Sequence, residues 1–398
     1  MSRSSRPGRL WGVSVFALGL LVAGGLAAWL VRGWLGPPPA AGTDGPPDRV
    51  VVSLSGQPQT LAFSPDGRWL AGGTWGGLPP HTGPAQDAAA VYLIDPDAKS
   101  VTATLELKNY VQAIAFSPDG KLLAVATAPP VTAIPTARPP GELVVCEVPG
   151  LAVKHRATAA VKAGFWDVAW AGNGSAVYTV EGLTDYLSTN TVRGWAAPGW
   201  AERPAITQPQ TLCFSAVAVS PDGKTVAVTD MTSQVGSPVV RLFDTASGQE
   251  GATTVVPLVM APTLAFAADG QAIRADDRGT FGWFDPTTGK TAQPCPLAAT
   301  GVARSRYSRA RAVSADAGLL AAGEMNRTKL VGQGLFDKQN YGAFVELTGA
   351  DGTRLGRWRL ADEYGSPPAV ALTADGGRVA ATFGTPAGGV VVVWPVPR

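Results

Sequence analysis

The chain has 398 residues, a hydrophobic content of 45%, a charged content of 16% and a formal net charge of +2. This nearly neutral balance excludes the strongly basic surface that nucleic acid binding requires, so we expect no nucleic acid partner. Two histidines are too few for a histidine-rich metal site.

The first predicted element is a transmembrane helix over residues 10–32. The run from Leu10 to Val31 contains no charged residue and no proline. Its length matches the roughly 20 helical residues that cross a hydrocarbon core. Trp11 and Trp29 lie near its two ends, where membrane proteins place aromatic side chains. The sequence therefore predicts a single membrane span.

Charges around this run predict its orientation. Three arginines precede it, whereas Arg32 alone follows it directly. The positive-inside rule then places residues 1–9 in the cytoplasm and the large remainder outside it, in the periplasm or at the cell surface. A cleaved secretory signal is the alternative, because Ala40 and Ala41 are small residues suited to a cleavage site.

Residues 33–48 are rich in proline and glycine and predict a linker. Prolines keep such a segment extended and fairly stiff, so it would act as a spacer between the membrane and the following domain. The domain itself is predicted over residues 49–398.

One turn motif recurs along that domain. Pro fixes φ at the first central position of the turn, Asp readily adopts the conformation of the next position, and Gly adopts the positive φ that follows. Apolar runs on both sides of the turn make each copy a β-hairpin. The seven copies are Ser64-Pro65-Asp66-Gly67, Ser117-Pro118-Asp119-Gly120, Ala171-Gly172-Asn173-Gly174, Ser220-Pro221-Asp222-Gly223, Ala267-Ala268-Asp269-Gly270, Ala315-Asp316-Ala317-Gly318 and Thr373-Ala374-Asp375-Gly376.

The copies are spaced by about 50 residues, and each holds room for four short strands. In the first copy, for example, further strands are predicted over 90–95 and 101–107. Four-stranded units at this spacing are typical of propeller blades. The predicted fold is therefore all-β: a seven-bladed β-propeller of four-stranded antiparallel blades, preceded by one transmembrane helix.

The pattern resembles the WD-repeat β-propeller family in its divergent bacterial form. The resemblance lies in the Ala-Phe-Ser-Pro-Asp-Gly segments at 62–67 and 115–120, and in the strand ends Leu242-Phe243-Asp244 and Trp283-Phe284-Asp285. No blade ends its third strand in Trp-Asp, and the usual Gly-His pair is absent from the sequence. The hydrogen-bonded tetrad of the family therefore cannot be transferred to this chain. Periplasmic propellers of the Tol type also use the Ser-Pro-Asp-Gly turn and are the nearest alternative.

The two ends of the domain predict how the ring closes. The last repeat reaches its third strand at 390–394 and stops at Arg398 without a fourth. An unassigned apolar segment, 50–54, precedes the first repeat. We expect this segment to complete the seventh blade, because closure removes the exposed edges of a sheet.

The connections between second and third strands carry four long insertions, at 75–88, 128–140, 181–191 and 324–341. All of them fall on one predicted face of the propeller, and loops grouped on a rigid scaffold often bind partners. Simple tolerance of insertions is the alternative. The candidate partner-binding residues are Trp75, His81, Asp185, Tyr186, Arg304, Arg306, Tyr307, Arg309, Arg311, Arg327, Lys329, Lys338 and Tyr341.

Four of these candidates are arginines within residues 304–311, in a connection on the same predicted face. Arginine groups of this kind bind anionic or acidic partners. An ordinary solvated loop would look the same. The partner is therefore predicted to be a protein or peptide, with an acidic one favoured by these arginines.

The sequence gives no support for catalysis. It contains no Gly-x-Ser-x-Gly, no His-Glu-x-x-His and no phosphate-binding loop. We therefore predict no catalytic residue, no metal site and no cofactor. The three cysteines, Cys146, Cys213 and Cys295, lack metal or redox spacing and are expected to be buried free thiols.

Three functions remain open at this point. The first is a membrane-anchored, non-catalytic scaffold for protein–protein interaction. The second is an extracytoplasmic enzyme or small-molecule binder that uses the central channel, and the third is a purely structural spacer. The fold alone does not decide among them.

Overall fold

The computed structural model describes residues 49–56, 58–75, 89–129, 139–183, 189–208, 214–230, 239–255, 263–277, 280–285, 287–288, 290, 311–313, 319–326, 342–349, 354–361, 369–385 and 388–396. Within these ranges the chain is all-β and contains no helix. The predicted transmembrane segment 10–32 and the linker 33–48 lie outside the described residues. No helix long and apolar enough to cross a membrane occurs in the described ranges.

The described strands form seven antiparallel sheets, which we number along the chain. Sheet 1 consists of β2 (Pro58–Phe63), β3 (Leu70–Thr74), β4 (Ala89–Asp95) and β5 (Ser100–Leu107). Sheet 2 consists of β6 (Tyr110–Phe116), β7 (Leu122–Ala128), β8 (Glu142–Glu147) and β9 (Val153–Thr158). Sheet 3 consists of β10 (Ala163–Trp170), β11 (Ala176–Leu183), β12 (Thr189–Ala196), β13 (Ala201–Glu202) and β14 (Ile206–Thr207).

The remaining sheets follow the same order of pairing. Sheet 4 consists of β15 (Phe214–Val219), β16 (Thr225–Asp230), β17 (Val239–Asp244) and β18 (Glu250–Val255), and sheet 5 of β19 (Thr263–Phe266), β20 (Ile273–Asp277) and β21 (Thr280–Phe284). Sheet 6 consists of β22 (Arg311–Val313), β23 (Leu319–Asn326), β24 (Gly342–Gly349) and β25 (Arg354–Ala361). Sheet 7 consists of β26 (Val370–Leu372), β27 (Arg378–Thr385), β28 (Gly388–Pro395) and β1 (Val50–Leu54).

Two sheets differ from the predicted four-stranded unit. Sheet 5 has three strands within the described residues. In sheet 3 the outer strand is split into β13 and β14, both of which pair with β12. Pro204 lies between the two pieces, and proline cannot donate a ladder hydrogen bond. The split is therefore the local consequence of a proline in an edge strand.

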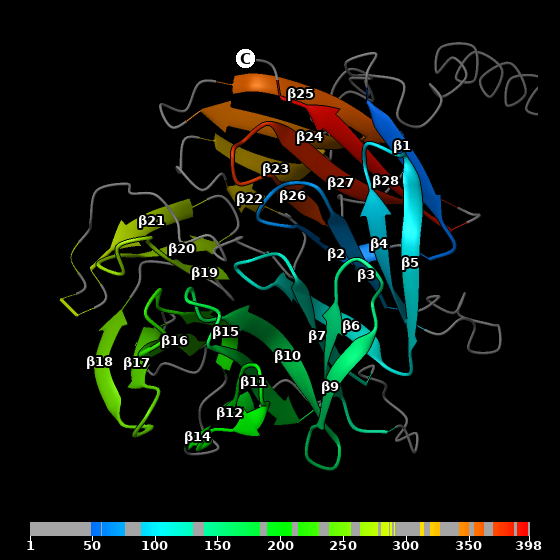
Figure 1. Ribbon diagram of the computed structural model, residues 1–398. Helices are drawn as coiled ribbons and strands as arrows, with labels where there is room; N and C mark the ends of the chain where they lie inside the picture. Colours follow the sequence, from blue (N-terminus) through cyan, green and yellow to red (C-terminus); the bar gives the residue numbers. More distant parts are fainter. Residues whose placement is uncertain are drawn as a thin grey trace, which may run out of the picture.

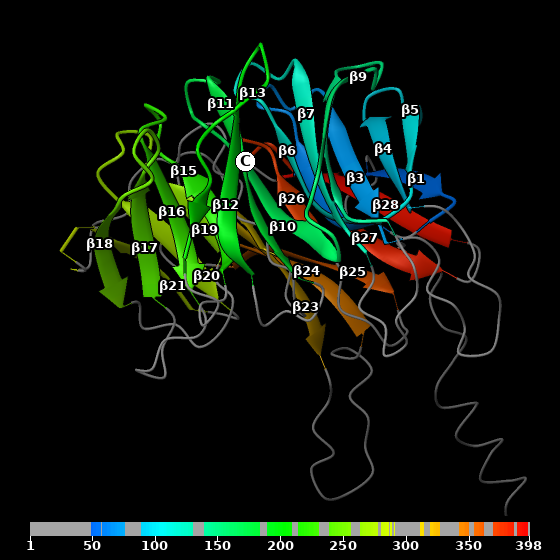
Figure 2. The ribbon, with the colours of Figure 1, turned by 90° about the horizontal axis from the view of Figure 1, so that it is seen from below.

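The sheets follow one another around a common centre in sequence order, as the colours of Figure 1 show. The first strands of neighbouring sheets contact each other from β2 through β6, β10 and β15 to β19, and β22 contacts β26, which contacts β2. In the view at right angles, the cyan and green sheets stand side by side (Figure 2). This repeated sheet architecture is consistent with a β-propeller.

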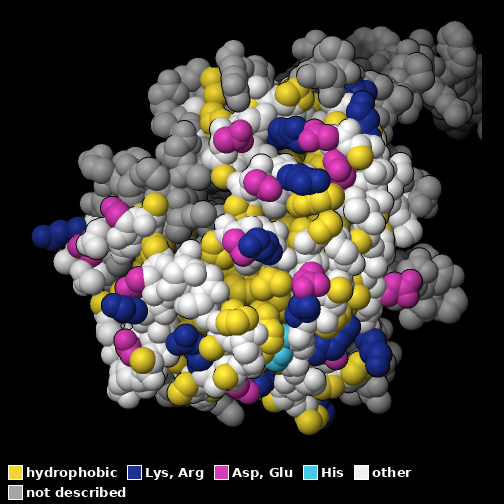
Figure 3. Space-filling model, in the orientation of Figure 1, with side chains coloured by type: hydrophobic (Ala, Val, Ile, Leu, Met, Phe, Trp, Pro, Cys, Tyr) yellow, Lys and Arg dark blue, Asp and Glu magenta, His cyan; other side chains and the backbone are white. Residues whose placement is uncertain are grey.

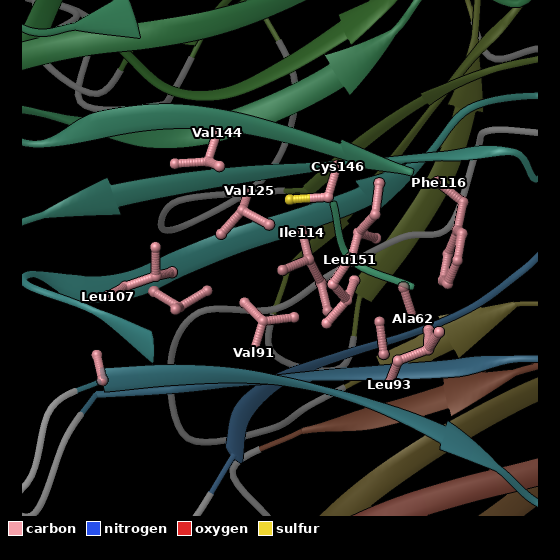
Figure 4. Close-up of a cluster of buried hydrophobic side chains, with 14 residues drawn as sticks. Ala62, Val91, Leu93, Leu107, Ile114, Phe116, Val125, Val144, Cys146 and Leu151 are labelled. Carbon is pink, nitrogen blue, oxygen red and sulfur yellow. The ribbon is translucent and has the colours of Figure 1, made fainter. Parts of the chain in front are cut away.

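The core is divided into clusters that lie between neighbouring sheets. In β4, Val91 and Leu93 face sheet 2, whereas Tyr92 and Ile94 face sheet 7. Alternate residues of a strand point to opposite sides, so a strand buried on both sides must be apolar throughout. The outer strand β5 is exposed along most of its length and carries polar residues instead. Figure 4 shows the cluster between sheets 1 and 2.

Cys146 belongs to the cluster of Figure 4 and is fully buried as a free thiol. Burial raises the pKa of Cys146 to about 12, an effect that the charge of Arg156 opposes in part. A thiol that stays protonated and enclosed is a packing group, not a reactive one. Cys213 and Cys295 lie outside the described residues.

The last sheet is completed by the first strand of the domain. β1 pairs with β28 in antiparallel register, from Val50 opposite Val393 to Leu54 opposite Gly389. The blue β1 accordingly lies beside the red β28 in Figure 1. Val52 and Leu54 are buried in a cluster shared by sheets 7 and 1. β1 therefore connects the last sheet, sheet 7, with the first, sheet 1.

Polar contacts support the same junction between sheets 7 and 1. The Arg378 guanidinium pairs with Asp97 at 2.7 Å, and the Thr382 hydroxyl donates to the Pro58 carbonyl at 3.0 Å. The hydroxyls of Ser55 and Tyr92 also form a hydrogen bond. These contacts join residues that are far apart in sequence, so they hold the last sheet against the first in addition to the chain that runs from β1 into β2.

Candidate functional site

The hairpin turns between first and second strands lie side by side. The Asn173 amide donates to the Asp222 carbonyl at 2.8 Å, which joins the turns of sheets 3 and 4. A Cβ added to Gly120 would meet Pro65, and one added to Gly67 would meet Thr373. The turns of sheets 7, 1 and 2 are thus also neighbours. Together these contacts place the turns on one face of the molecule, here called the turn face.

Each turn is held by its own side chains. In the second copy Gly120 has a φ of 70°, and the Asp119 carboxylate accepts hydrogen bonds from the Ser117 hydroxyl and the Lys121 amide. The hydrogen bond from Ser117 lowers the pKa of Asp119, and the one from Ser220 lowers that of Asp222. The turn carboxylates thus act as caps of the turns. No group of residues able to hold a metal ion occurs in the described ranges.

The opposite side of the molecule is the insertion face. In an antiparallel sheet the connection between second and third strands leaves from the end opposite the first hairpin turn, and so does the connection to the next sheet. Both kinds of connection therefore meet on this face. The insertion face points away from the viewer in Figure 1; Figure 3, in the same orientation, therefore shows the turn face, where charged side chains of both signs lie among hydrophobic ones.

The structure describes two of the residues predicted to bind a partner. Trp75 follows β3 directly on the insertion face, and Arg311 begins β22 on the same face, opposite Ala322. Eleven predicted residues lie outside the described ranges: His81, Asp185, Tyr186, Arg304, Arg306, Tyr307, Arg309, Arg327, Lys329, Lys338 and Tyr341.

In several sheets a polar residue lies near the end of the second strand, where the connection to the third strand begins; this position is here called the root of the insertion. In sheet 1 the Thr74 hydroxyl accepts from the Ala90 amide at 2.8 Å and donates to the Ala90 carbonyl at 3.3 Å. In sheet 2 the Thr127 hydroxyl makes the same two bonds with Glu142, at 2.7 and 3.0 Å. Each bond pair ties the second strand to the start of the third, directly below an insertion.

Carboxylates take over this position in sheets 3 and 4. Asp230 is fully buried, and its Oδ2 accepts hydrogen bonds from Nε and Nη2 of Arg241 at 3.0 and 2.9 Å. Arg241 also pairs with Glu250 on the outer strand at 2.7 Å. The guanidinium thus links the second, third and fourth strands of sheet 4 at the root of its insertion.

Sheet 3 contains the same arrangement. Arg193 pairs with Glu181 at 3.1 Å and with Glu202 at 2.7 Å. It also donates to the Thr158 carbonyl of sheet 2 at 3.0 Å. Glu181 in turn accepts a hydrogen bond from the Ala160 amide. This network therefore fixes both an insertion root and the contact between two sheets.

Sequence inspection missed these roots, although a signal was present. Thr74, Thr127, Glu181 and Asp230 stand at the same distance after the Asp or Asn of their hairpin turns. Polar residues at one fixed repeat position, each at the end of an apolar strand, indicate a shared structural role.

The first strands carry a second repeated feature. β2, β6, β10 and β15 each have a register shift, at Gln59, Gln112, Trp166 and over Ser215 and Ala216 respectively. A bulge redirects side chains and often accompanies functional positions. Here two of the redirected groups make structural bonds, because Trp166 donates to the Gly182 carbonyl and Ser215 bonds to Thr229. The Trp166 and Ser215 side chains at these bulges thus join the first and second strands of their own sheets.

Of the two histidines, the structure describes His155, which lies in an aromatic cluster between sheets 2 and 3. Its ring stacks on Trp200 with centroids 5.2 Å apart, and Trp195 lies 6.2 Å away. Trp170 packs against Trp200 edge to face. Burial lowers the pKa of His155 below its ordinary value of 6.5, and the charge of Glu202 opposes this shift. The neutral imidazole is therefore a packing group of this junction.

Stability of the protein is expected to fall as the pH drops through the His155 transition. Because the unfolded chain binds a proton at His155 more readily than the folded one, its contribution is complete above pH 6.5 and is lost as the pH approaches the lower folded pKa. Urea midpoints measured on both sides of pH 6.5 will report this loss. In the His155→Phe variant, which keeps a stacking ring, the dependence should flatten. An unchanged profile would contradict the assignment.

Comparison of the chain with models of known protein families gave no match, and a search of curated proteins found no similar sequence.

Proposed function

We propose that the chain is a seven-bladed β-propeller of the WD-repeat type, held at the membrane by a helix over residues 10–32. Its insertion face binds another protein or a peptide, and the molecule acts as a non-catalytic scaffold outside the cytoplasm. The observation that carries this proposal is the set of hydrogen bonds and ion pairs at the insertion roots. Thr74, Thr127 and Glu181 fix the start of three of the four insertions on a rigid body, which is how binding loops are usually supported, and Asp230 does the same for the corresponding connection of sheet 4.

The position of the N-terminus supports the same assignment. Val50 pairs with Val393, and the nearby Val396 amide donates to the Gly377 carbonyl beside the last hairpin turn. Arg49 therefore enters the domain on the turn face. With the proposed anchor attached there, the insertion face points away from the membrane and is open to a partner.

The linker is long enough to allow this orientation of the insertion face away from the membrane. Residues 33–48 are rich in proline, and an extended proline-rich segment covers about 3 Å per residue. The spacer can thus hold the domain clear of the lipid headgroups. A folded scaffold kept at a distance from the bilayer can receive a partner on its outer face without interference from the membrane.

Cross-linking in native membranes tests this function. The tagged full-length protein is compared with a variant in which Arg304, Arg306, Arg309 and Arg311 are all replaced by Ala, and captured proteins are identified by mass spectrometry. We expect a discrete partner that the wild type captures and the variant loses. The control is Lys121→Ala with Lys224→Ala on the turn face, which should capture as the wild type does. Equal capture by all three proteins, or no enriched protein, would contradict the proposal.

A further inference from the structure

We propose that a row of apolar side chains on the insertion face binds an extended, acidic segment of the partner. The row, here called the apolar row, consists of Trp75, Tyr110, Pro139 and Val161 and runs across sheets 1, 2 and 3. This inference rests on the proposed function, because it assigns a partner chemistry and a place on the same face.

An aromatic pair forms the first end of the row. Trp75 and Tyr110 come from sheets 1 and 2, and their rings lie nearly parallel, with an angle of 10° and centroids 6.2 Å apart. Both side chains are half-buried, so part of each remains open to solvent. Aromatic rings supply a large contact area and lose little conformational entropy when a ligand binds.

The middle of the row is held rigidly from below. Asn109 is buried, and its amide donates to the carbonyls of Pro139 and Pro140 at 3.1 and 2.8 Å. The Gly141 amide donates to the Ala163 carbonyl, and the Gly141 carbonyl accepts from Ala159, both at 2.9 Å. Pro139 itself is exposed. These bonds connect the aromatic pair with the loop that follows sheet 2.

Val161 forms the other end of the row. It stands in the tight turn closed by the Ala163 amide and the Ala160 carbonyl at 2.9 Å, and 81% of its surface is exposed. Glu181 holds this turn through the Ala160 amide. Val161 is the most exposed of the large hydrophobic side chains in the described ranges. A fixed turn with an apolar tip is suited to contact with another molecule.

The charges beside the row determine the partner chemistry. Lys108 precedes the buried Asn109, and Lys162 follows Val161, and both lysines are exposed. No ion pair joins either lysine to another residue of the described part of the chain. A segment with carboxylates and apolar side chains complements this surface.

Preorganisation gives the row its expected strength. The bonds to Asn109, Gly141 and Glu181 fix its backbone before any ligand arrives. A ligand then loses its own freedom on binding, whereas the surface loses little. An extended peptide fits better than a compact one, because the residues of the row come from the edges of three successive sheets.

Selection from a displayed library of short random peptides tests the inference. The full-length protein is used in nanodiscs of neutral lipid, and the enriched peptides are sequenced and their affinities measured at low and high salt. We expect peptides that combine Asp or Glu with aromatic or aliphatic residues. Lys108→Glu with Lys162→Glu should weaken their binding by about tenfold or more, as should Val161→Asp. The turn-face control, Lys121→Glu with Lys224→Glu, should leave binding unchanged.

The opposite results are equally distinct. Enriched peptides without acidic residues, or equal binding by the two charge-reversed variants, would overturn the inference. So would lysine-dependent binding to vesicles of phosphatidylglycerol with no peptide enriched, because the ligand would then be a lipid surface. If these variants have no effect while the arginine variant still loses its captured partner, the apolar row fails and the proposed function stands. If no partner is captured at all, both fail.

Discussion

Replacing both Val52 and Leu54 by Asp is expected to separate sheet 7 from sheet 1 and to unfold much of the domain. The two side chains are 5% and 6% exposed and lie in the cluster that the sheets share. Truncation of one such side chain costs about 2–5 kcal/mol, and a buried charge without a partner costs more. Denaturant titration of the full-length protein measures the loss, which should exceed 4 kcal/mol or abolish the folded state.

A matched control lies on the same strand. Val51 alternates with Val52 and is 47% exposed, so Val51→Asp tests the cost of a new carboxylate in β1 without burying it. We expect a change in unfolding free energy of about 1 kcal/mol or less. Equal loss from the two changes would show that β1 acts through strand propensity and not through the junction of sheets 7 and 1.

The second large effect is expected from Arg241→Ala. This change removes the guanidinium that makes two hydrogen bonds to Asp230, whose side chain has no solvent exposure. Removal of one partner from a buried ion pair typically costs 3–5 kcal/mol, because the remaining charge stays buried. Denaturant titration reports the loss, and replacement of both Asp230 and Arg241 by Leu should recover a large part of it.

An exposed pair provides the comparison. Lys154 and Glu147 lie 2.6 Å apart, but about half of each side chain is exposed to solvent. Lys154→Ala should therefore change the unfolding free energy by less than about 1 kcal/mol. If Arg241→Ala costs no more than Lys154→Ala, the root of the sheet 4 insertion is not held by this network.

Local turn chemistry explains why the hairpins could be predicted from the sequence. Gly67, Gly120 and Gly223 all have φ near 70°, as the Ser-Pro-Asp-Gly pattern requires. The apolar sequence of β4 agrees with its burial on both sides, and the polar residues of β5 agree with its exposure at the outer edge of the sheet. These features depend on residues that are close together in the sequence, so the sequence alone suffices to predict them.

Features that depend on how separate sheets meet could not be predicted in this way. The stack of Trp75 on Tyr110 joins two sheets, and Arg193 reaches Glu181, Glu202 and Thr158 on different strands. The positions of these side chains depend on strand register and on the bulges in the first strands. No local sequence pattern predicts either of them. The split of the outer strand in sheet 3 was foreseeable, because Pro204 stands in it.

Site-specific photo-cross-linking on the two faces tests the central claim most directly. A photoreactive residue is placed at Val161 on the insertion face or at Lys224 on the turn face of the full-length protein, in native membranes. Both positions are exposed. We predict a discrete partner adduct from position 161 and none from position 224. The same adduct from both positions, or an adduct from position 224 alone, would contradict the assignment of the insertion face as the binding surface.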